Sequence, residues 1–183
     1  QGTISVSVEM KNYETAIYTL TITRTDKIPQ NISAEDITLT YGDADATISV
    51  TGVKTELSYE VVEDSNNNGD VVTVDINGKV SIENAGTAII KITTKESDTY
   101  AEAECEMTVT VDKRPVTVTA KSYSIKVGDA LPTYAYDVAG LVNGETLPID
   151  VTISCTAIDS NNAGACAITV SGATNSTNYS FTY

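Results

Sequence analysis

The feature of this sequence that most constrains its fold is an internal repeat. The run from Asp112 to Ala130, DKRPVTVTAKSYSIKVGDA, aligns without a gap on the run from Asp26 to Ala44, DKIPQNISAEDITLTYGDA. The two runs lie 86 residues apart and share Asp-Lys, a proline, an alanine and Gly-Asp-Ala at the same spacing. A period of that length is the size of one small domain. The sequence therefore predicts that its 183 residues hold small tandem domains rather than one large domain.

Short runs with apolar residues at alternate positions follow one another along the whole sequence, and no run has a helical period with caps. Up to the end of the first repeat, the sequence predicts strands near 3–8, 16–23, 36–41, 46–51, 57–62, 71–75, 79–82, 86–93 and 101–111. In the remainder it predicts strands near 116–120, 122–127, 133–138, 149–157, 164–171 and 178–183. Short strands at this spacing are typical of an all-β fold built from tandem immunoglobulin-like β-sandwich modules.

The repeat also predicts where the modules begin and end. We expect one module at residues 28–113 and a second at residues 114–183. Residues 1–27 are expected to be the last two strands of a preceding module, because Gly2, Asn12-Tyr13 and Asp26-Lys27 match Gly86, Thr99-Tyr100 and Asp112-Lys113. On this interpretation the sequence begins inside a longer protein or after processing.

The second module is expected to lack its final strand. Tyr179 corresponds to Tyr100 of the first module. After Tyr100 the first module continues for 13 residues, to Lys113, whereas only four residues follow Tyr179.

The charge balance excludes several kinds of partner. Eleven Lys and Arg residues stand against 25 Asp and Glu residues, and the net charge is −14. Phosphate backbones and anionic lipids would repel such a chain, so we expect no nucleic-acid partner. No apolar run approaches the length of a membrane span, so we expect no membrane insertion. The partners that we do expect are neighbouring modules of the same polypeptide.

The composition also argues against catalysis. The sequence has no histidine, which excludes Ser-His and Cys-His nucleophiles and imidazole ligation of zinc. The carboxylates are dispersed over the predicted strands and turns, and nothing in their spacing indicates a glycosidase pair. The sequence therefore predicts a protein that is not an enzyme and that has neither catalytic residues nor a cofactor.

The three cysteines fall on predicted strands. Cys105 alternates with Ala103 and Met107 on one face of its strand, which predicts a free thiol that points into the core. Cys155 and Cys166 lie on inward faces of two strands that we expect to be neighbours. They are interpreted either as a cross-strand disulfide, formed in an oxidising compartment, or as two packed thiols.

One run matches the ligand spacing of a calcium loop, D-x-N-x-N-G-x5-D. Its residues are Asp64, Asn66, Asn68, Asp70 and Asp75. Such a loop requires a helix on either side, whereas this run enters a β-hairpin predicted by Asn77-Gly78, and the hairpin includes Asp75. We therefore favour a solvated Asn/Asp turn over a calcium site, and predict no metal.

Two tyrosines raise the question of sugar binding. Tyr134 and Tyr136 alternate in TYAYDV, so they lie on the same face of the predicted strand. They could stack on a sugar ring, but we favour packing in the core or across strands.

Two segments resemble known families. Residues 57–113, with the signatures V-x-V-D-x-N-G-K-V, A-G-T-A and T-V-T-V, resemble bacterial immunoglobulin-like domains of group 2, the intimin and invasin type. Residues 116–147 and 163–183, with G-L-V-N-G-E-T-L and N-Y-S-F-T-Y, resemble the MBG-type module of large bacterial surface proteins.

These resemblances imply a function without catalysis. They point to a repeat segment, either a stalk or spacer or an adhesive arm, of a large bacterial cell-surface or secreted protein, outside the cell. The alternative is a carbohydrate- or protein-binding accessory module of a secreted enzyme or adhesin, whose host or glycan ligand the sequence does not name. The links at 26–29 and 112–115 are only two or three residues long, which predicts a stiff rod.

Overall fold

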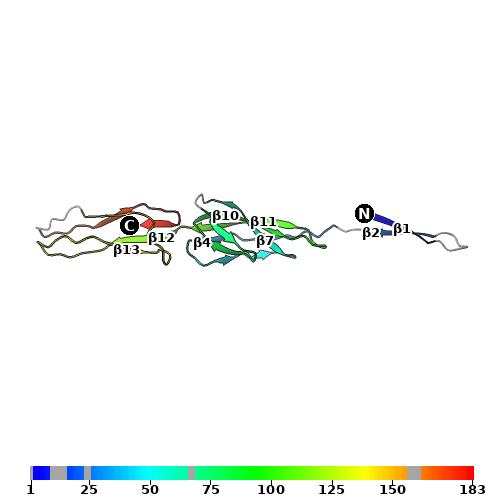
Figure 1. The fold of residues 1–183 in the computed structure, drawn as a ribbon, viewed down its shortest axis with the longest axis horizontal. Coiled ribbons are helices and arrows are strands. Elements are labelled where there is room, and N and C mark those ends of the chain that lie inside the picture. Colours follow the sequence, from blue (N-terminus) through cyan, green and yellow to red (C-terminus); the bar gives the residue numbers. More distant parts are fainter. Residues whose placement is uncertain (1, 9–15, 23–25, 66–68, 156–161) are drawn as a thin grey trace.

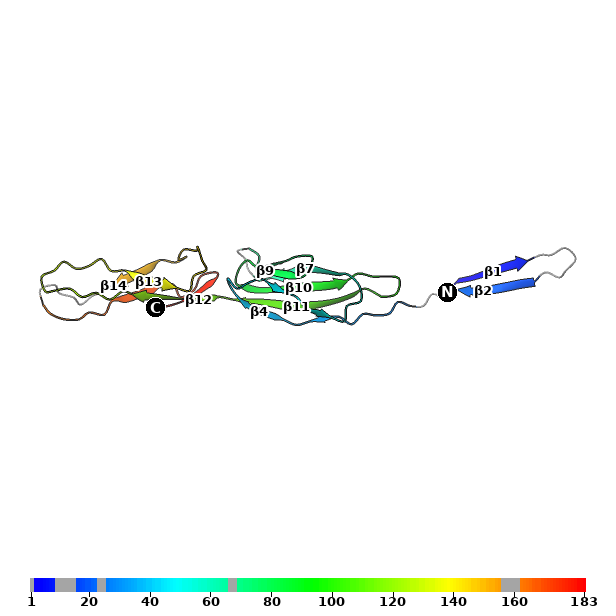
Figure 2. The ribbon, with the colours of Figure 1, turned by 90° about the horizontal axis from the view of Figure 1, so that it is seen from below.

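Every regular element of the structure is a β-strand, which confirms the all-β fold class. The structure is a computed structural model and describes residues 2–8, 16–22, 26–65, 69–155 and 162–183. Within these ranges there is no helix, and hence none with the length and apolar character needed to cross a membrane. Figures 1 and 2 show two β units that lie end to end along the long axis. We call residues 28–112 the first unit and residues 114–183 the second unit.

The N-terminal residues form a hairpin. Strand β1 (Gly2–Val8) pairs with β2 (Ala16–Ile22) in antiparallel register, with Gly2 opposite Ile22. The hairpin is a two-stranded sheet of its own. Its origin in a preceding module stays a prediction.

In the described residues of the first unit there are nine strands in three sheets. The strands are β3 (Ser33–Ala34), β4 (Ile37–Thr40), β5 (Ala46–Thr47), β6 (Val50–Thr51), β7 (Leu57–Asp64), β8 (Val72–Val74), β9 (Lys79–Ile82), β10 (Gly86–Thr94) and β11 (Ala103–Asp112). The sheet orders are β4-β11-β10-β7, β5-β9-β8 and β3-β6. The pairing of β4 with β11 is parallel, and the other pairs are antiparallel.

Alternate residues of the strands form the core of the first unit. Ile90 and Ile92 of β10 and Val109 of β11 are fully buried, and they pack with Val80 of β9 and with Val71. Burying a side chain of this size contributes about 1.5–3 kcal/mol. Because the buried residues come from separate sheets, the unit is consistent with a β-sandwich.

The predicted strand at 46–51 is wrong as a single element. The structure divides it into β5, which pairs with β9, and β6, which pairs with β3. The chain passes from one sheet to another at Ile48, whose side chain is buried and whose N–H donates to the carbonyl of Gly78. Alternation alone cannot reveal this change of partner.

The described residues of the second unit form five strands around a smaller core. They are β12 (Arg114–Ala120), β13 (Tyr136–Ala139), β14 (Val151–Ser154), β15 (Thr169–Gly172) and β16 (Tyr179–Thr182). One sheet has the order β13-β12-β16, with β12 and β16 parallel, and the other is the pair β14-β15. The buried side chains of this core are Val116, Val118, Tyr179 and Phe181, and the two valines are fully buried.

The predicted strand at 122–127 is absent, because residues 122–127 form no strand. The corresponding segment of the first unit is β4, which pairs with β11. Among the described residues of the second unit, no strand lies beside 122–127 to pair with it. A strand needs a partner for its backbone groups, and here that partner is lacking.

The two units share a turn that is hydrogen-bonded to the first residue of the unit. In each, a Ser-x-x-Tyr turn ends in a parallel bridge to the first residue of the unit, Ile28 with Tyr100 and Arg114 with Tyr179. The serine hydroxyl accepts the tyrosine N–H in both turns, at 3.0 Å for Ser97 and 3.2 Å for Ser176. The two units therefore repeat the hydrogen bonds of this turn as well as its sequence.

One buried polar network distinguishes the first unit. The side-chain amide nitrogen of Gln30 lies within hydrogen-bond distance of the Thr94 hydroxyl (3.1 Å) and the Ala101 carbonyl (2.8 Å), and its oxygen accepts the Lys54 N–H at 2.9 Å. Both Gln30 and Thr94 are buried. Buried polar groups of this kind are costly to leave without partners. At the corresponding position the second unit has the apolar Val116.

We expect Gln30→Ala to destabilise the first unit by about 2 kcal/mol, because it leaves the Lys54 N–H and the Ala101 carbonyl without their partner. Urea unfolding of the full chain measures this change. Asn31→Ala, at the neighbouring exposed side chain, is the control and should change the free energy of unfolding by less than about 0.5 kcal/mol. Equal effects of the two variants would contradict the prediction.

Candidate functional site

The two units are joined by a single residue. Strand β11 ends at Asp112 and β12 begins at Arg114, so only Lys113 lies between them. The Asp112 carbonyl accepts the Tyr41 N–H at 2.9 Å, and the Arg114 N–H donates to the Asn178 carbonyl at 2.9 Å. The Lys113 ammonium donates to the Ser176 carbonyl at 2.6 Å. The link is therefore held on both sides by hydrogen bonds.

A tight turn at the end of β4 faces the second unit. The Asp43 N–H donates to the Thr40 carbonyl, and the Asp43 carboxylate accepts the Thr40 N–H, both at 2.9 Å. Between them Gly42 has a φ of 82°, a backbone conformation that residues with a side chain rarely adopt. A Cβ atom at Gly42 would lie 2.3 Å from a methyl carbon of Val142 in the second unit. Glycine is therefore needed here both for the turn and for the close approach of the two units.

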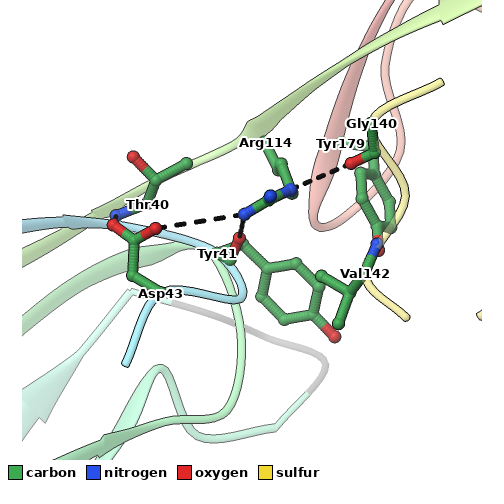
Figure 3. Close-up of polar contacts among 7 residues, drawn as sticks. All are labelled: Thr40, Tyr41, Asp43, Arg114, Gly140, Val142 and Tyr179. Atoms are coloured by element: carbon green, nitrogen blue, oxygen red, sulfur yellow. Dashed lines mark hydrogen bonds and ion pairs between the residues drawn. The ribbon is translucent and has the colours of Figure 1, made fainter. Parts of the chain in front are cut away.

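The Arg114 guanidinium bridges the two units (Figure 3). Its Nη1 donates to the Tyr41 carbonyl at 3.2 Å, and its Nε donates to the Gly140 carbonyl at 2.9 Å. An Asp43 carboxylate oxygen lies 3.9 Å from Nη1. Because this ion pair is long and partly exposed, it contributes little to stability by itself. The hydrogen bond to the Tyr41 carbonyl joins the two units, and the one to the Gly140 carbonyl holds the guanidinium in place within the second unit.

Two tyrosines and one glutamate meet across the junction. Tyr41 packs against the cores of both units, and its ring meets that of Tyr179 edge-on, with centroids 5.5 Å apart. Both hydroxyls donate to the Glu145 carboxylate, Tyr41 at 2.8 Å and Tyr179 at 2.5 Å. The Tyr179 hydroxyl also accepts the Val142 N–H at 3.2 Å. Burial and the hydrogen bond to Glu145 raise the pKa of Tyr41, and they raise the pKa of Tyr179 to about 12.

An asparagine pair forms a further part of the junction. The Asn178 side-chain oxygen accepts the Ala85 N–H at 2.9 Å, and its amide nitrogen donates to the Asn84 side-chain oxygen at 3.1 Å. Asn84 in turn donates to the Asp70 carbonyl at 2.8 Å. The Ser-x-x-Tyr turn of the second unit is thereby attached to the end of the first.

The polar groups of the junction are hydrogen-bonded to one another. Hydrogen bonds that cross between the units join Tyr41 to Glu145, Ala85 to Asn178, Asn178 to Asn84 and Arg114 to Tyr41. In the part of the chain that the structure describes, no three His, Cys, Asp or Glu side chains are grouped so as to hold a metal ion. What this arrangement can do chemically is to fix two domains in one relative orientation.

Two residues of the calcium-loop pattern, Asp64 and Asp75, accept backbone hydrogen bonds. The Asp64 carboxylate accepts the Val71 N–H at 2.5 Å, and the Asp75 carboxylate accepts N–H groups of Asn77 and Lys79 in the β8–β9 hairpin. These hydrogen bonds lower the pKa of Asp75, and the bond from the Lys79 N–H has the largest effect. Asn66 and Asn68 lie outside the described residues, so the geometry of the loop as a whole stays untested.

The cysteines lie away from the junction. Cys155 and Cys166 form a disulfide that closes a loop with a sequence separation of 11, with Cα atoms 6.2 Å apart. Cys105 is a free, partly buried thiol packed against the core of the first unit. Its burial raises the pKa of the thiol, which disfavours the reactive thiolate.

The two tyrosines considered for sugar binding are separated by the fold. Tyr136 packs against the core of the second unit. Tyr134 makes an edge-on contact with Tyr123, with centroids 6.0 Å apart, and its hydroxyl is buried. They therefore do not form a joint aromatic surface.

Sequence reasoning did not single out the junction side chains. Two sequence motifs contain these residues and could have drawn attention to them. Gly42 and Asp43 belong to the repeated Gly-Asp-Ala, and Glu145 belongs to the G-L-V-N-G-E-T-L motif. What the sequence could not indicate is that Tyr41 and Glu145, 104 residues apart, are partners.

Gly42→Ala is expected to weaken the junction, whereas Gly128→Ala, at the corresponding position of the second repeat, provides a matched control. Both glycines have positive φ, so both variants bear a strain of about 1–2 kcal/mol. Only position 42 has a neighbour in the way, since a Cβ at Gly128 meets nothing within 4 Å. We expect Gly42→Ala to cost about 1–3 kcal/mol more than Gly128→Ala in urea unfolding. Adding Val142→Ala should recover most of that difference, and failure to do so would contradict the clash.

Tyr179 should titrate abnormally. Its raised pKa means that the folded protein holds the phenolic proton more tightly than the unfolded chain. The resulting stabilisation is present below pH 10 and is lost as the pH rises from 10 towards about 12. The difference in tyrosinate absorbance between the wild type and Tyr179→Phe should show a transition near pH 12. A transition at the ordinary tyrosine pKa would contradict this prediction.

Comparison with known proteins identifies part of the chain. A family model described as the MBG domain (YGX type) matches residues 116–183. No curated protein matches the chain. The MBG domain is a non-catalytic module found in surface proteins. Residues 116–183, which form nearly the whole of the second unit, are thus similar to an MBG domain of the YGX type.

Proposed function

We propose that this chain is a stalk or spacer segment of a large bacterial cell-surface or secreted protein, in which β modules are locked end to end. On this proposal residues 28–113 are a group-2 immunoglobulin-like module and residues 114–183 an MBG-type module. The segment holds other parts of the polypeptide at a distance from the cell and carries out no catalysis. The similarity of residues 116–183 to the MBG domain supports this location.

The observation that carries the proposal is the construction of the junction. A flexible tether would have a long linker rich in glycine or serine. Here the linker is Lys113 alone, and hydrogen bonds from Tyr41, Arg114 and Asn178 cross between the units. Domains of one chain move relative to each other by default unless the interface between them is large and hydrophobic. At this small, polar junction the restriction must therefore come from the one-residue link and the hydrogen bonds together. These contacts favour a fixed angle, which is what a spacer requires.

The charge distribution is consistent with an extended segment. Residues 28–113 contain 17 acidic and five basic residues, whereas residues 114–183 contain five acidic and three basic residues. Most of the net charge of −14 is therefore carried by the first unit. Repeated along a stalk, such acidic modules would repel one another and resist folding back.

The stiffness can be measured as a distance between the two units. Nitroxide labels at the exposed positions Thr73 and Thr152, in a Cys105→Ser background, report this distance by pulsed electron paramagnetic resonance. We expect one narrow distance distribution for the otherwise native chain. Asn178→Ala should broaden it, because the contacts with Asn84 and Ala85 are lost.

Asn175→Ala is the matched control, since the Asn175 side chain is exposed and donates a hydrogen bond to the adjacent Thr174, within the second unit. It should leave the distance distribution narrow. A distribution as broad in the native chain as in Asn178→Ala would show that the units hinge freely, and the spacer proposal in its stiff form would be wrong.

A further inference from the structure

The turn from Val142 to Glu145 touches the first unit at both of its ends. The Glu145 carboxylate accepts the Tyr41 hydroxyl at 2.8 Å, and a methyl carbon of Val142 lies 2.3 Å from where a Cβ atom at Gly42 would be. The Val142 N–H also donates to the Tyr179 hydroxyl at 3.2 Å. The turn is closed by the Glu145 N–H, which donates to the Val142 carbonyl at 3.0 Å. A change to the two residues between these ends therefore acts directly on the junction.

Those two residues are Asn143 and Gly144, and both are exposed. In an Asn-Gly pair the glycine nitrogen can reach the asparagine side-chain carbonyl, because glycine has no Cβ to hinder the approach. Gly144 has a φ of 88°, and a Cβ atom added there would meet nothing within 4 Å. Among the described residues, no group is hydrogen-bonded to the Gly144 N–H or to the Asn143 side chain. The peptide group between them is therefore free to rotate.

Another Asn-Gly pair, Asn77-Gly78, is held in place. The Gly78 N–H donates to the Asp75 carbonyl at 3.0 Å, and the Asn77 N–H donates to the Asp75 carboxylate at 2.8 Å. The Tyr59 ring lies against this turn, since a Cβ atom at Gly78 would be 2.7 Å from a ring carbon. A third pair, at 68–69, includes a residue outside those that the structure describes. Asn77-Gly78 thus provides an internal comparison for Asn143-Gly144.

We propose that Asn143 is a site of spontaneous deamidation, and that its isoaspartate product loosens the junction. The Gly144 backbone nitrogen gives its proton to hydroxide and attacks the side-chain carbonyl carbon of Asn143. A carbon–nitrogen bond forms, the side-chain nitrogen takes up a proton, and it leaves as ammonia. One water molecule then opens the resulting cyclic imide. Opening at one carbonyl gives aspartate, and opening at the other gives isoaspartate.

The two products differ in what they do to the turn. Both add one negative charge, but only isoaspartate inserts an additional carbon atom into the main chain between Val142 and Glu145. The hydrogen bond that closes the turn and the position of the Glu145 carboxylate cannot then both be kept. Isoaspartate is therefore expected to displace Glu145 from the hydroxyls of Tyr41 and Tyr179. This effect on stiffness rests on the proposed function, whereas the chemistry at Asn143 does not.

The first test measures the reaction itself in the complete chain. The protein is incubated at mildly alkaline pH, where the amide nitrogen loses its proton more readily, and isoaspartate is located by mass-spectrometric peptide mapping. We expect Asn143 to react roughly two- to tenfold faster than Asn77, because attack by the Gly78 nitrogen first requires its hydrogen bond to break. A rate at Asn77 equal to or above that at Asn143 would overturn the proposal.

The second test measures the junction with the nitroxide labels at Thr73 and Thr152. The distance distribution should broaden in the incubated chain as isoaspartate accumulates at position 143. Asn143→Gln, whose longer side chain does not form this imide readily, should keep a narrow distribution after the same incubation. Freshly prepared Asn143→Asp carries the charge without the longer main chain, and it should also keep a narrow distribution.

The outcomes separate this inference from the spacer proposal. Equal broadening in incubated Asn143→Gln, or a narrow distribution in chains that carry isoaspartate at position 143, would overturn the inferred effect on the junction. A broad distribution in the fresh native chain would instead count against the spacer proposal. In that case the relative rates at Asn143 and Asn77 would still decide whether Asn143 is the modification site.

Discussion

The arrangement of the two units depends on the length of the link between them. With Lys113 as the only residue between β11 and β12, the backbone passes almost directly from one sheet into the next. The ends of the units must then touch, and whatever groups lie there must be compatible. Tyr41 satisfies this requirement by packing its ring against both cores, and Gly42 does so by leaving room for Val142.

The short link also explains why a polar junction can be firm. A single hydrogen bond contributes about 0.5–1.5 kcal/mol net, and partly exposed ones contribute less. Contacts of this strength would not hold two separate proteins together, because association has a large entropic cost. Within one chain most of that cost is already met by the covalent link. The hydrogen bonds of Arg114, Asn178 and Glu145 therefore only need to select one orientation among those that the link permits.

The sequence predicted the strands that alternate strictly and have strong partners. Strands β10, β11 and β12 lie within two residues of the predicted ranges at each end, because their alternation comes from burial on one face. The prediction failed where strand formation depends on an available pairing partner rather than on the alternating pattern of apolar residues. Residues 122–127 alternate as well as β4 does, yet form no strand, and residues 46–51 are divided between two sheets.

The junction was harder to predict than the fold for a similar reason. The two repeats have the same turn, with Thr40 and Asp43 hydrogen-bonded as Lys126 and Asp129 are. Sequence comparison treats these turns as equivalent. Among the described residues only the first turn is packed against another unit, and the Tyr41 ring that makes the contact is replaced by Val127 in the second turn. An alternating pattern predicts whether a tyrosine faces inward, but it cannot identify a glutamate 104 residues away as its partner.

The parallel pairing of early and late strands has a mechanical consequence. In the first unit β4 runs parallel to β11, and in the second β12 runs parallel to β16. A pulling force along the first unit draws its entering segment backwards and its leaving strand forwards. The two strands are then loaded in shear, so their hydrogen bonds must break together rather than one after another. The rate of forced unfolding follows the unfolding barrier. A unit with this topology can thus bear tension along its length even if its equilibrium stability is modest.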